Sequence, residues 1–535
     1  MASQILLLSI PSLFFSLLAY ASFFTSFAYS AAGAEIANGR KEAEALLEWK
    51  VSLDNRSQSL LSSWAGDSPC NWVGISCDKS GSVTNISLPN SSLRGRLNTL
   101  RFSSFPNLIV LILRNNSLYG SVPSHIGNLS NLSILDLSFN SISGNIPSEI
   151  STMKSIRVFT LSENHIGGSI PNEIGMLSSL SQIIWHENYL GGLVPASISN
   201  LSHLTDLYLN GNQLSGGIPQ EVGKLRSLDL LDLSNNNLSG VLPTSIGNLS
   251  NLSFLYLYEN KLSGFLPREV GMLEDLLTLQ LSDNNFEGPI PTSIGNMKSL
   301  NFLQLKHNFL TGKIPDSFGN LTGSLTSLDL SYNNLNGTIP PSLGNLIILS
   351  QLLLANNSLF GPIPPEMNNL THLYLLQIYS NRLSGNLPRD VCLGGLLSYF
   401  SALDNYFTGP IPKSLRNCSS LLRLRLERNQ LSGNISEAFG THPYLYYMGL
   451  SDNLLHGELS WKWDQFNNLT VFKISGNKIS GIIPAALGKA THLQVLDLSS
   501  NQLVGRIPKE LGNLKLIELA LNDNKLSGDI PFDVA

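Results

Sequence analysis

The chain has 535 residues, of which 42% are hydrophobic and only 13% are charged, and its formal net charge is −5. A single hydrophobic core rarely grows beyond about 250–300 residues, so this length indicates either several domains or an array of repeats. The negative balance, without a run of basic residues, argues against a nucleic-acid-binding surface.

The N-terminus has the features of a targeting segment. Residues 5–29 form an apolar run, and Ala28 and Ser30 suit the −3 and −1 positions of a cleavage site before Ala31. Residues 1–30 are therefore predicted to be a secretory signal peptide, with a signal anchor as the alternative because no Lys or Arg precedes the run. Past residue 35 no uninterrupted apolar stretch reaches the length that a membrane-spanning helix requires, so no second membrane span is expected.

Cysteine and sequon usage points to the secretory pathway. The chain has four cysteines, which fit an oxidising compartment. It also has seventeen Asn-x-Ser/Thr sequons, which indicate a glycosylated secreted or cell-surface protein. The predicted acceptors include Asn85, Asn128, Asn200, Asn248, Asn320, Asn369 and Asn468.

The segment that follows the signal peptide is predicted to cap the rest of the chain. Residues 43–50 have the spacing of an amphipathic helix, whose apolar face continues in Leu60, Leu61 and Trp64.

A cysteine pair lies at the end of this segment. Cys70 and Cys77 are seven residues apart on either side of Trp72 and Gly74. We expect Cys70 to pair with Cys77, because the segment has too small a core to hold itself otherwise. Residues 31–82 are therefore predicted to form an N-terminal cap that covers the open edge of a repeat array.

From residue 83 onward the chain repeats with a period of about 24 residues. Eighteen positions at this spacing are Asn, from Asn116 to Asn524, with one residue gained near Gly323 and one lost before Leu516. The pattern around each Asn, LxxLxLxxNxLxGxIP, is that of leucine-rich repeats. Residues 83–535 are predicted to hold about nineteen repeats, and the predicted fold is an α/β repeat solenoid. We expect a right-handed superhelix whose parallel strands line the concave face.

The repeated residues are interpreted as scaffold. Alternate Leu side chains place two apolar groups on one face of a short strand. The Asn amide is expected to turn inward and bond the backbone of neighbouring repeats, since an unpaired buried polar group costs about 1–3 kcal/mol. The Gly permits a tight turn, and the Pro ends strand pairing. Trp185 replaces an inward Leu, so we expect it in the core.

Two features concern the second half of the array. The spacing of Cys392 and Cys418 exceeds the repeat period by two residues, which places them on adjacent convex segments. A disulfide between them is expected, with two buried thiols as the alternative. The chain ends inside a repeat without closing cysteines or a polar cap, so the array is expected to be cut short.

The cap and repeats together resemble a known family. The cap motif Leu60-x2-Ser63-Trp64-x5-Cys70-x-Trp72-x-Gly74-Ile75-x-Cys77, followed by repeats with Gly-x-Ile-Pro, resembles the ectodomains of plant leucine-rich repeat receptor-like kinases over residues 41–535. The irregular segments 433–440 and 457–460, with Cys392 and residues 412–418, resemble the type that interacts with the male-discoverer receptor. In that family more repeats, a membrane helix and a cytoplasmic Ser/Thr kinase would follow, so the resemblance implies truncation before them.

The sequence gives no reason to expect catalysis. It contains no Gly-x-Gly-x-x-Gly loop, His-Arg-Asp or Asp-Phe-Gly, and its nine His are scattered. No cofactor or metal is therefore expected.

Two functional classes remain open, together with the possibility that the product has no function. The first is the ectodomain of a cell-surface receptor that binds a peptide or protein ligand, with a leucine-rich repeat co-receptor as a further partner. The second is a secreted binding protein of the apoplast, such as a polygalacturonase inhibitor or a decoy. A non-functional truncated product is the remaining interpretation.

The expected binding surface follows from the strand pattern. Residues that flank the Leu of LxL are expected to point to solvent on the concave face, where the usual filling is Asp-Leu-Ser. Residues that differ from Asp-Leu-Ser cluster in the middle of the array, and their Tyr and amide side chains suit the binding of an extended peptide. The alternative is that exposed Tyr and Gln merely cover the sheet and bind nothing. The candidate ligand-binding residues are Tyr208, Asn210, Ser234, Tyr256, Tyr258, Gln280, Ser282, Gln304, Lys306, Gln377 and Tyr379.

Overall fold

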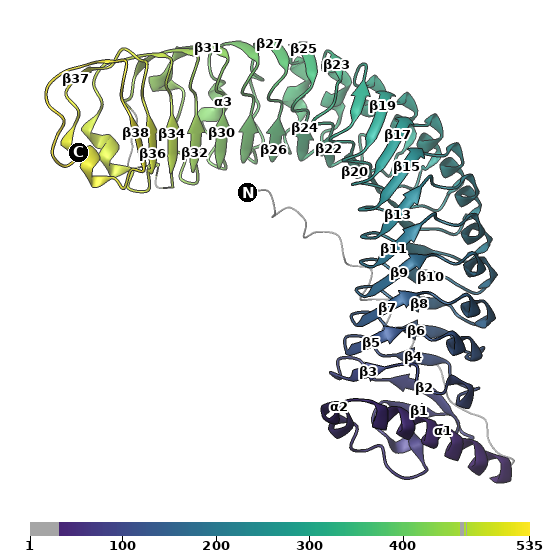
Figure 1. Cartoon of the computed structure of the whole chain (residues 1–535). Helices are drawn as coiled ribbons and strands as arrows, with labels where there is room; N and C mark the ends of the chain where they lie inside the picture. Colours follow the sequence, from purple (N-terminus) through teal and green to yellow (C-terminus); the bar gives the residue numbers. More distant parts are fainter. Residues whose placement is uncertain (1–31, 461–464, 467, 535) are drawn as a thin grey trace.

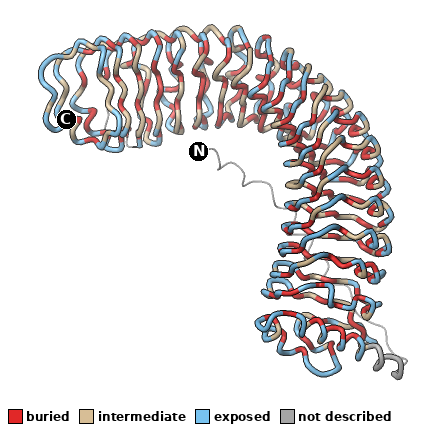
Figure 2. The backbone as a smooth tube through the Cα atoms, viewed as in Figure 1, coloured by how far each residue is buried: buried red, intermediate tan, exposed pale blue. Residues whose placement is uncertain are grey.

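The repeats stack side by side into one long curved solenoid (Figure 1). The computed structural model describes residues 32–460, 465–466 and 468–534, so the expected signal peptide lies outside the described residues. The N-terminal cap occupies one end of the arc and the last repeats the other. Buried residues run through every repeat along the whole arc, which gives one continuous core rather than separate domains (Figure 2).

One strand per repeat forms a long parallel sheet, which we call the inner sheet because its strands from β20 to β32 lie along the inner side of the arc in Figure 1. Neighbouring strands pair in parallel with one residue of each repeat opposite the equivalent residue of the next. The inner strands are β2 (Val83–Ser87), β4 (Val110–Ile112), β6 (Ile134–Asp136), β8 (Val158–Thr160), β10 (Gln182–Ile184), β12 (Asp206–Tyr208), β14 (Leu230–Asp232), β16 (Phe254–Tyr256), β18 (Thr278–Gln280), β20 (Phe302–Gln304), β22 (Ser327–Asp329), β24 (Gln351–Leu353), β26 (Leu375–Gln377), β28 (Tyr399–Ser401), β30 (Arg423–Arg425), β32 (Tyr447–Gly449), β34 (Val471–Lys473), β36 (Val495–Asp497) and β38 (Glu518–Ala520), and β1 (Ile75–Cys77) pairs with β2 antiparallel.

A second strand of each repeat, after the repeated Asn, forms the flank sheets. In the described part of the chain these are a sheet from β3 to β21, one from β23 to β35, and a final pair. Their strands are β3 (Arg94–Arg96), β5 (Ser117–Ser121), β7 (Ser141–Asn145), β9 (His165–Ser169), β11 (Tyr189–Gly192), β13 (Gln213–Gly216), β15 (Asn237–Val241), β17 (Lys261–Phe265), β19 (Asn285–Pro289), β21 (Phe309–Thr311), β23 (Asn336–Gly337), β25 (Ser358–Pro362), β27 (Arg382–Asn386), β29 (Tyr406–Gly409), β31 (Gln430–Asn434), β33 (Leu454–Glu458), β35 (Lys478–Ser480), β37 (Val504–Gly505) and β39 (Lys525–Leu526).

The outer side of most repeats is a single turn of 3₁₀-helix that follows the repeated Pro. The ring of Pro restrains φ to the helical range and leaves no N–H to satisfy, which suits Pro to the start of such a turn. These turns are Ser124–Asn128, Ser148–Thr152, Asn172–Met176, Ala196–Asn200, Gln220–Lys224, Thr244–Asn248, Arg268–Met272, Thr292–Asn296, Asp316–Asn320, Pro341–Asn345, Pro365–Asn369, Ala485–Lys489 and Lys509–Asn513. In one irregular repeat the turn is a short α-helix, α3 (Lys413–Arg416).

The repeated Asn side chains form the predicted ladder. The Asn236 Oδ1 accepts a hydrogen bond from the Leu214 N–H at 2.9 Å, and its Nδ2 donates to the Leu209 and Leu233 carbonyls at 3.0 and 3.2 Å. Each Asn therefore joins its own repeat to the repeat before it. Asn235, which precedes Asn236, has φ 50°, and Gly240, four residues after Asn236, has φ 78°. Gly adopts that conformation at no steric cost, as the sequence predicts.

The two irregular spacings leave the inner sheet intact. Phe302 pairs with Ser327 although their spacing is one residue longer than the period, and Val495 pairs with Glu518 although their spacing is one residue shorter. The extra residue therefore lies outside the strands, in the turn that contains the exposed Gly323, and the missing one is lost before β38. Strand register is maintained because a one-residue slip would move every Leu to the other face of the sheet.

The N-terminal cap consists of α1 (Ala32–Ser52), α2 (Asn55–Leu60) and the antiparallel strand β1. Trp49, Trp64 and Trp72 pack in sequence with ring centroids 6.0 and 5.6 Å apart, and all three are buried. Leu61 is also buried, as predicted. The prediction for Leu60 is wrong: its side chain is 49% exposed, because it lies at the end of α2 on the side away from the core.

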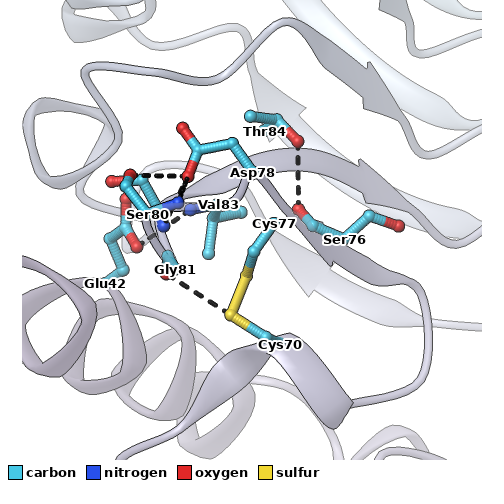
Figure 3. The surroundings of a disulfide bond; sticks show 10 residues. Glu42, Cys70, Ser76, Cys77, Asp78, Ser80, Gly81, Val83 and Thr84 are labelled. Atoms are coloured by element: carbon cyan, nitrogen blue, oxygen red, sulfur yellow. Dashed lines mark hydrogen bonds between the residues drawn. A yellow bond between two sulfur atoms is a disulfide. The ribbon is translucent and has the colours of Figure 1, made fainter. Parts of the chain in front are cut away.

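Both expected disulfides are present. Cys70 bonds to Cys77 in the cap, with 5.4 Å between their Cα atoms, and Cys392 bonds to Cys418 with 5.8 Å. Figure 3 shows that the first disulfide lies beside Glu42 of α1, whose Oε2 accepts a hydrogen bond from the Val83 N–H at 3.0 Å. The cap is thereby tied to the first inner strand. Trp185 is fully buried, as expected for a core residue.

Candidate ligand-binding site

Four of the predicted residues lie in one row across neighbouring inner strands. Tyr208 is opposite Asp232, which is opposite Tyr256, and the register continues to Gln280 and Gln304. The two Tyr and two Gln side chains are half-buried. At about 4.8 Å between strands, the row extends about 19 Å, a length that roughly six residues of extended peptide would cover. The structure therefore brings these four residues together as one surface, which we call the central row.

Gln377 belongs to the same register but stands apart from the central row. Asp329 and Leu353 lie between Gln304 and Gln377, which places the two Gln three strands apart, or about 14 Å. Asp329 is 8% exposed and Leu353 is half-buried. A ligand that reaches both Gln residues must cross an apolar position between them.

The second predicted row follows the ends of the same strands. Asn210, Tyr258, Lys306 and Tyr379 are half-buried and therefore reachable from the concave side. The Asn210 Oδ1 is buried and has no hydrogen-bond partner among the described residues.

Two members of the predicted set are not exposed. Ser234 is 0% exposed and Ser282 is 7% exposed, so neither points freely to solvent as expected from the alternation. The Ser234 hydroxyl donates to the Asp232 Oδ1 at 2.6 Å, and its N–H donates to the same atom at 3.0 Å. Larger neighbours cover the small Ser side chains, and the Tyr258 phenol contacts Ser234. Ser234 and Ser282 therefore support the surface from below and do not form part of it.

Burial sets the charge state of this surface. Desolvation raises the pKa of Asp232 to about 6, although two hydrogen bonds from Ser234 oppose the shift. Desolvation, with the nearby Asp232 carboxylate, raises the pKa of Tyr256 to about 12, and burial likewise raises the pKa of Tyr208 and Tyr379. The phenols are therefore neutral hydrogen-bonding groups at any physiological pH.

A chain of contacts that the sequence reasoning missed borders the second row. The Tyr332 and Tyr379 hydroxyls lie 3.1 Å apart, although the residues belong to repeats that are not adjacent. Ala355, which belongs to the repeat between them, is small and fully buried. His307 packs edge-on against Tyr332 and lies 2.7 Å from Asp283. Asp283, His307 and Tyr332 each stand just before a repeated Asn, and this shared position in the repeat could have predicted that they lie side by side.

A charged cluster farther along the inner sheet was also missed. The Arg423 and Arg425 guanidinium groups lie 5.0 and 5.6 Å from the Tyr447 ring centroid. The buried Glu427 accepts from the Arg425 Nε and the Tyr447 hydroxyl, both at 3.2 Å. The Arg423 Nε is buried without a partner among the described residues. The two guanidinium groups of this cluster could bind an anionic group. Residues 423–425 read Arg-Leu-Arg where other inner strands have Asp-Leu-Ser, and this difference could have identified the cluster from the sequence.

The predicted glycan acceptors lie mostly away from the central row. Five of these acceptors are exposed in the 3₁₀ turns on the outer side of the solenoid: Asn128, Asn200, Asn248, Asn320 and Asn369. Asn468 is also exposed, and Asn85 is half-buried on β2, at the N-terminal end of the inner sheet. No sequon in the sequence falls on an inner strand between β10 and β38.

The described residues show little sign of other chemistry. The described residues contain no cluster of three or more His, Cys, Asp or Glu side chains that could bind a metal ion. A shallow hollow of about 330 Å³ lies between flank strands, lined by residues that include Glu163, His165 and Glu187, and is distinct from the central row. Across the described part of the chain, no helix has the length and apolar character that a membrane crossing requires.

Family models match several parts of the chain. Residues 40–78 match the leucine rich repeat N-terminal domain, residues 259–482 match a leucine-rich repeat region, and five single repeats match between residues 107 and 514. The first match coincides with the cap and the others with the solenoid.

Solved structures decide the family. The plant peptide hormone receptor RGFR1, in complex with RGF2, is 39% identical with a TM-score of 0.83, over 86% of this chain and 73% of that chain. The chain belongs to the plant leucine-rich repeat receptor ectodomains. The ectodomain of the Arabidopsis receptor kinase HAESA, solved with the peptide hormone IDA and the co-receptor SERK1, is 32% identical with a TM-score of 0.68, over 92% of this chain and 95% of that chain.

Curated relatives of this receptor ectodomain match over shorter segments. The receptor-like kinase RGI3 of Arabidopsis thaliana is 39% identical over 92 residues, which cover 17% of this chain and 8% of that protein. MDIS1-interacting receptor like kinase 2 of Arabidopsis thaliana is 43% identical over 95 residues, which cover 17% of this chain and 9% of that protein. The family models that match are of leucine-rich repeats and of their N-terminal domain, and the similar solved structures are of plant receptors.

Proposed function

We propose that this chain is the ligand-recognition ectodomain of a plant receptor kinase and binds a peptide on the concave side of the inner sheet. The central row of Tyr208, Tyr256, Gln280 and Gln304 is the observation that carries the proposal. Phenol and amide groups at strand-to-strand spacing can pair with the backbone of an extended peptide, and Tyr supplies contact area at low entropic cost.

Two independent observations support this surface. The inner strands from β10 to β38 carry no sequon, so glycans on the seven acceptors named above would leave the central row free. Of the similar ectodomains, RGFR1 is a peptide hormone receptor solved with RGF2, and HAESA was solved with the peptide hormone IDA. HAESA was also solved with a co-receptor, and we infer that this chain likewise takes a leucine-rich repeat co-receptor once its ligand is bound.

The proposed ligand contacts exclude the two buried serines. They comprise the central row and the accessible second-row residues, with Gln377 at the far end. The proposed set is Tyr208, Asn210, Tyr256, Tyr258, Gln280, Gln304, Lys306, Gln377 and Tyr379.

We also propose a placement within the family and in the cell. The irregular repeats and the 43% identity to MDIS1-interacting receptor like kinase 2 support membership of that receptor type. Such a receptor would present this ectodomain at the cell surface after passage through the secretory pathway. The two disulfides fit that oxidising route.

The test uses peptides selected from a random phage-displayed library on the whole chain and then synthesised. Tyr256→Ala with Gln280→Ala should weaken their binding by at least about 1–2 kcal/mol, measured by calorimetry. The matched control is Tyr406→Ala with Gln430→Ala, because these residues are exposed on the adjacent flank strands β29 and β31. Unchanged dissociation constants for the first pair, in a protein with an unaltered unfolding midpoint, would refute the central row as the site.

A further inference from the structure

One sequon of the chain contains a disulfide-bonded cysteine. Residues 417–419 read Asn-Cys-Ser, an acceptor pattern for N-glycosylation, and the middle residue Cys418 is bonded to Cys392. Asn417 and Ser419 are both exposed, whereas Cys418 between them is 0% exposed. The two residues that a glycan transferase must reach therefore lie at the surface, on either side of a buried covalent link.

Asn417 has the same hydrogen bonds in its turn as an ordinary acceptor of the outer side. Asn248 is followed by Leu249 and Ser250, and in both sequons the Asn carbonyl accepts a hydrogen bond from the Ser N–H at 3.0 Å. In both, the middle residue also donates its N–H to the carbonyl three residues earlier at 3.1 Å. The two sequons therefore differ chiefly in the residue between Asn and Ser, which makes Asn248 a matched control.

The folded turn around Cys418 holds its backbone firmly. The Cys418 carbonyl accepts hydrogen bonds from the Leu421 N–H at 3.2 Å and from the His442 Nδ1 at 3.1 Å. His442 belongs to the next repeat and is 0% exposed. An acceptor segment must leave such a turn to enter the active site of a transferase, so glycan transfer requires the turn to be open.

The disulfide can close this turn earlier than packing alone. At about 5–20 residues/s, synthesis of the 24 residues from Cys418 to His442 takes about 1–5 s, and a Leu-containing turn has no partner from the next repeat until then. Cys392 precedes Cys418 by 26 residues, so it is already in the secretory compartment when Cys418 enters. Disulfide closure can therefore fix the turn before the glycan is attached.

Both reactions use a reactant from outside the chain. In glycan transfer a bond forms between the Asn417 Nδ2 and C1 of the first sugar, the bond from C1 to a polyprenyl diphosphate breaks, and the amide loses one proton. In disulfide closure the Cys392 and Cys418 thiols lose two electrons and two protons to the disulfide of an oxidoreductase, which becomes a dithiol.

We propose that Asn417 is an N-glycosylation site whose use is decided by the redox state of Cys392 and Cys418. A chain on which transfer comes first carries the glycan and then closes the disulfide, because Asn417 is exposed in the closed turn. A chain on which the disulfide closes first keeps Asn417 bare. The secreted protein is therefore a mixture whose composition follows the oxidising strength of the compartment.

The experiment measures the occupancy of each acceptor by mass spectrometry. The whole chain is secreted from plant cells and deglycosylated enzymatically in heavy-oxygen water, so that each released glycan leaves a labelled Asp. Asn417 should be occupied on less than about half of the wild-type chains, while Asn248 is occupied on nearly all of them. Cys392→Ser should raise the occupancy of Asn417 at least about twofold and leave that of Asn248 unchanged.

Two further samples separate the disulfide from the effects of substitution. Dithiothreitol added to cells that make the wild-type chain delays closure without a mutation, and should raise the occupancy of Asn417 relative to that of Asn248. Cys392→Ser with Cys418→Leu gives residues 417–419 the Asn-Leu-Ser pattern of the control. This double variant should bring Asn417 to the occupancy of Asn248.

The outcomes decide the inference. Equal occupancy of Asn417 and Asn248 in the untreated wild type would overturn it, because the disulfide would then place no limit on transfer. A bare Asn417 in every sample would overturn it too, as would a rise in the double variant alone, which would assign the effect to the Cys side chain and not to its bond. If Asn248 is also bare, the chain does not meet the transferase, and both this inference and the proposed secretory route fail.

Discussion

The Ser234 hydroxyl donates a hydrogen bond to the Asp232 Oδ1 at 2.6 Å, and both side chains are buried between larger neighbours on the inner sheet. The pair is a fixed polar contact beneath the central row. It replaces solvent as the partner of a carboxyl group that would otherwise be buried alone. The repeated Asp-Leu-Ser pattern is therefore a structural device in the middle of the array.

Replacement of Asp232 by Asn should change the pH dependence of local stability. The folded pKa of Asp232, about 6, is raised above its ordinary 3.8, so its contribution to stability is complete below pH 3.8 and is lost as pH rises through 6. Asp232→Asn keeps the acceptor for Ser234 without the charge. It should stabilise this repeat by up to about 3 kcal/mol at pH 7.5 relative to pH 4.

Hydrogen exchange of residues 226–245 at the two pH values measures this effect. The control is Asp136→Asn, since Asp136 bonds Ser138 in the same way in a half-buried setting. Equal exchange of the Asp232→Asn variant and the wild type at pH 7.5 would contradict the prediction.

Glu42 should make the N-terminal cap sensitive to pH. Burial raises the pKa of Glu42 to about 7, while hydrogen bonds with Val83 and Ser82 oppose the shift and Asp78 adds to it. Because 7 lies above the ordinary 4.5, stability from this group is present below pH 4.5 and declines as pH rises through 7. Glu42→Gln mimics the protonated carboxyl group and should abolish the decline, which is on the order of 3 kcal/mol.

Limited proteolysis of the cap at pH 5 and pH 8 provides the measurement. The wild type should be cleaved faster at pH 8, and Glu42→Gln should be cleaved at similar rates at both. Glu44→Gln is the matched control, because Glu44 is exposed on the same helix. A pH effect that persists in Glu42→Gln would show that another group is responsible.

Substitution of Asn284, which belongs to the ladder, should cost much more stability than substitution of its neighbour Asn285. The Asn284 Oδ1 accepts from the Leu262 N–H at 3.0 Å, and its Nδ2 donates to the Leu257 carbonyl at 2.8 Å. Asn284→Ala leaves these buried backbone groups unpaired and should cost at least about 2–3 kcal/mol. Asn285 is exposed on β19, so Asn285→Ala should be close to neutral. Thermal unfolding of both variants tests this, and similar midpoints would contradict the ladder.

The second disulfide should stabilise the irregular repeats. Cys392 and Cys418 are separated by 26 residues, and for a loop of this length the chain-entropy relation gives about 3–4 kcal/mol. Substitution of both by Ser should speed hydrogen exchange around residues 388–442 and leave the first repeats unchanged. Alkylation of the native unreduced protein checks the bond itself, since labelled thiols at either position would disprove it.

Much of the architecture could be predicted from the sequence because each repeat meets the same local demands. The regular repeat period, the inward Asn, the turn at Gly240 and the pairing of Cys70 with Cys77 all follow from short-range chemistry. The row from Tyr208 to Gln304 was predictable for the same reason. Once the period fixes the register, equivalent residues of neighbouring repeats must lie side by side.

What the sequence could not determine is how far each side chain on that surface is covered. Ser234 and Ser282 are buried, and the Tyr332 hydroxyl lies 3.1 Å from the Tyr379 hydroxyl, which belongs to the next repeat but one. These outcomes depend on the sizes of side chains one and two repeats away, which are neighbours only after the solenoid has stacked. Alternation along a strand decides which face a residue occupies, but packing between repeats decides which residues remain exposed on that face.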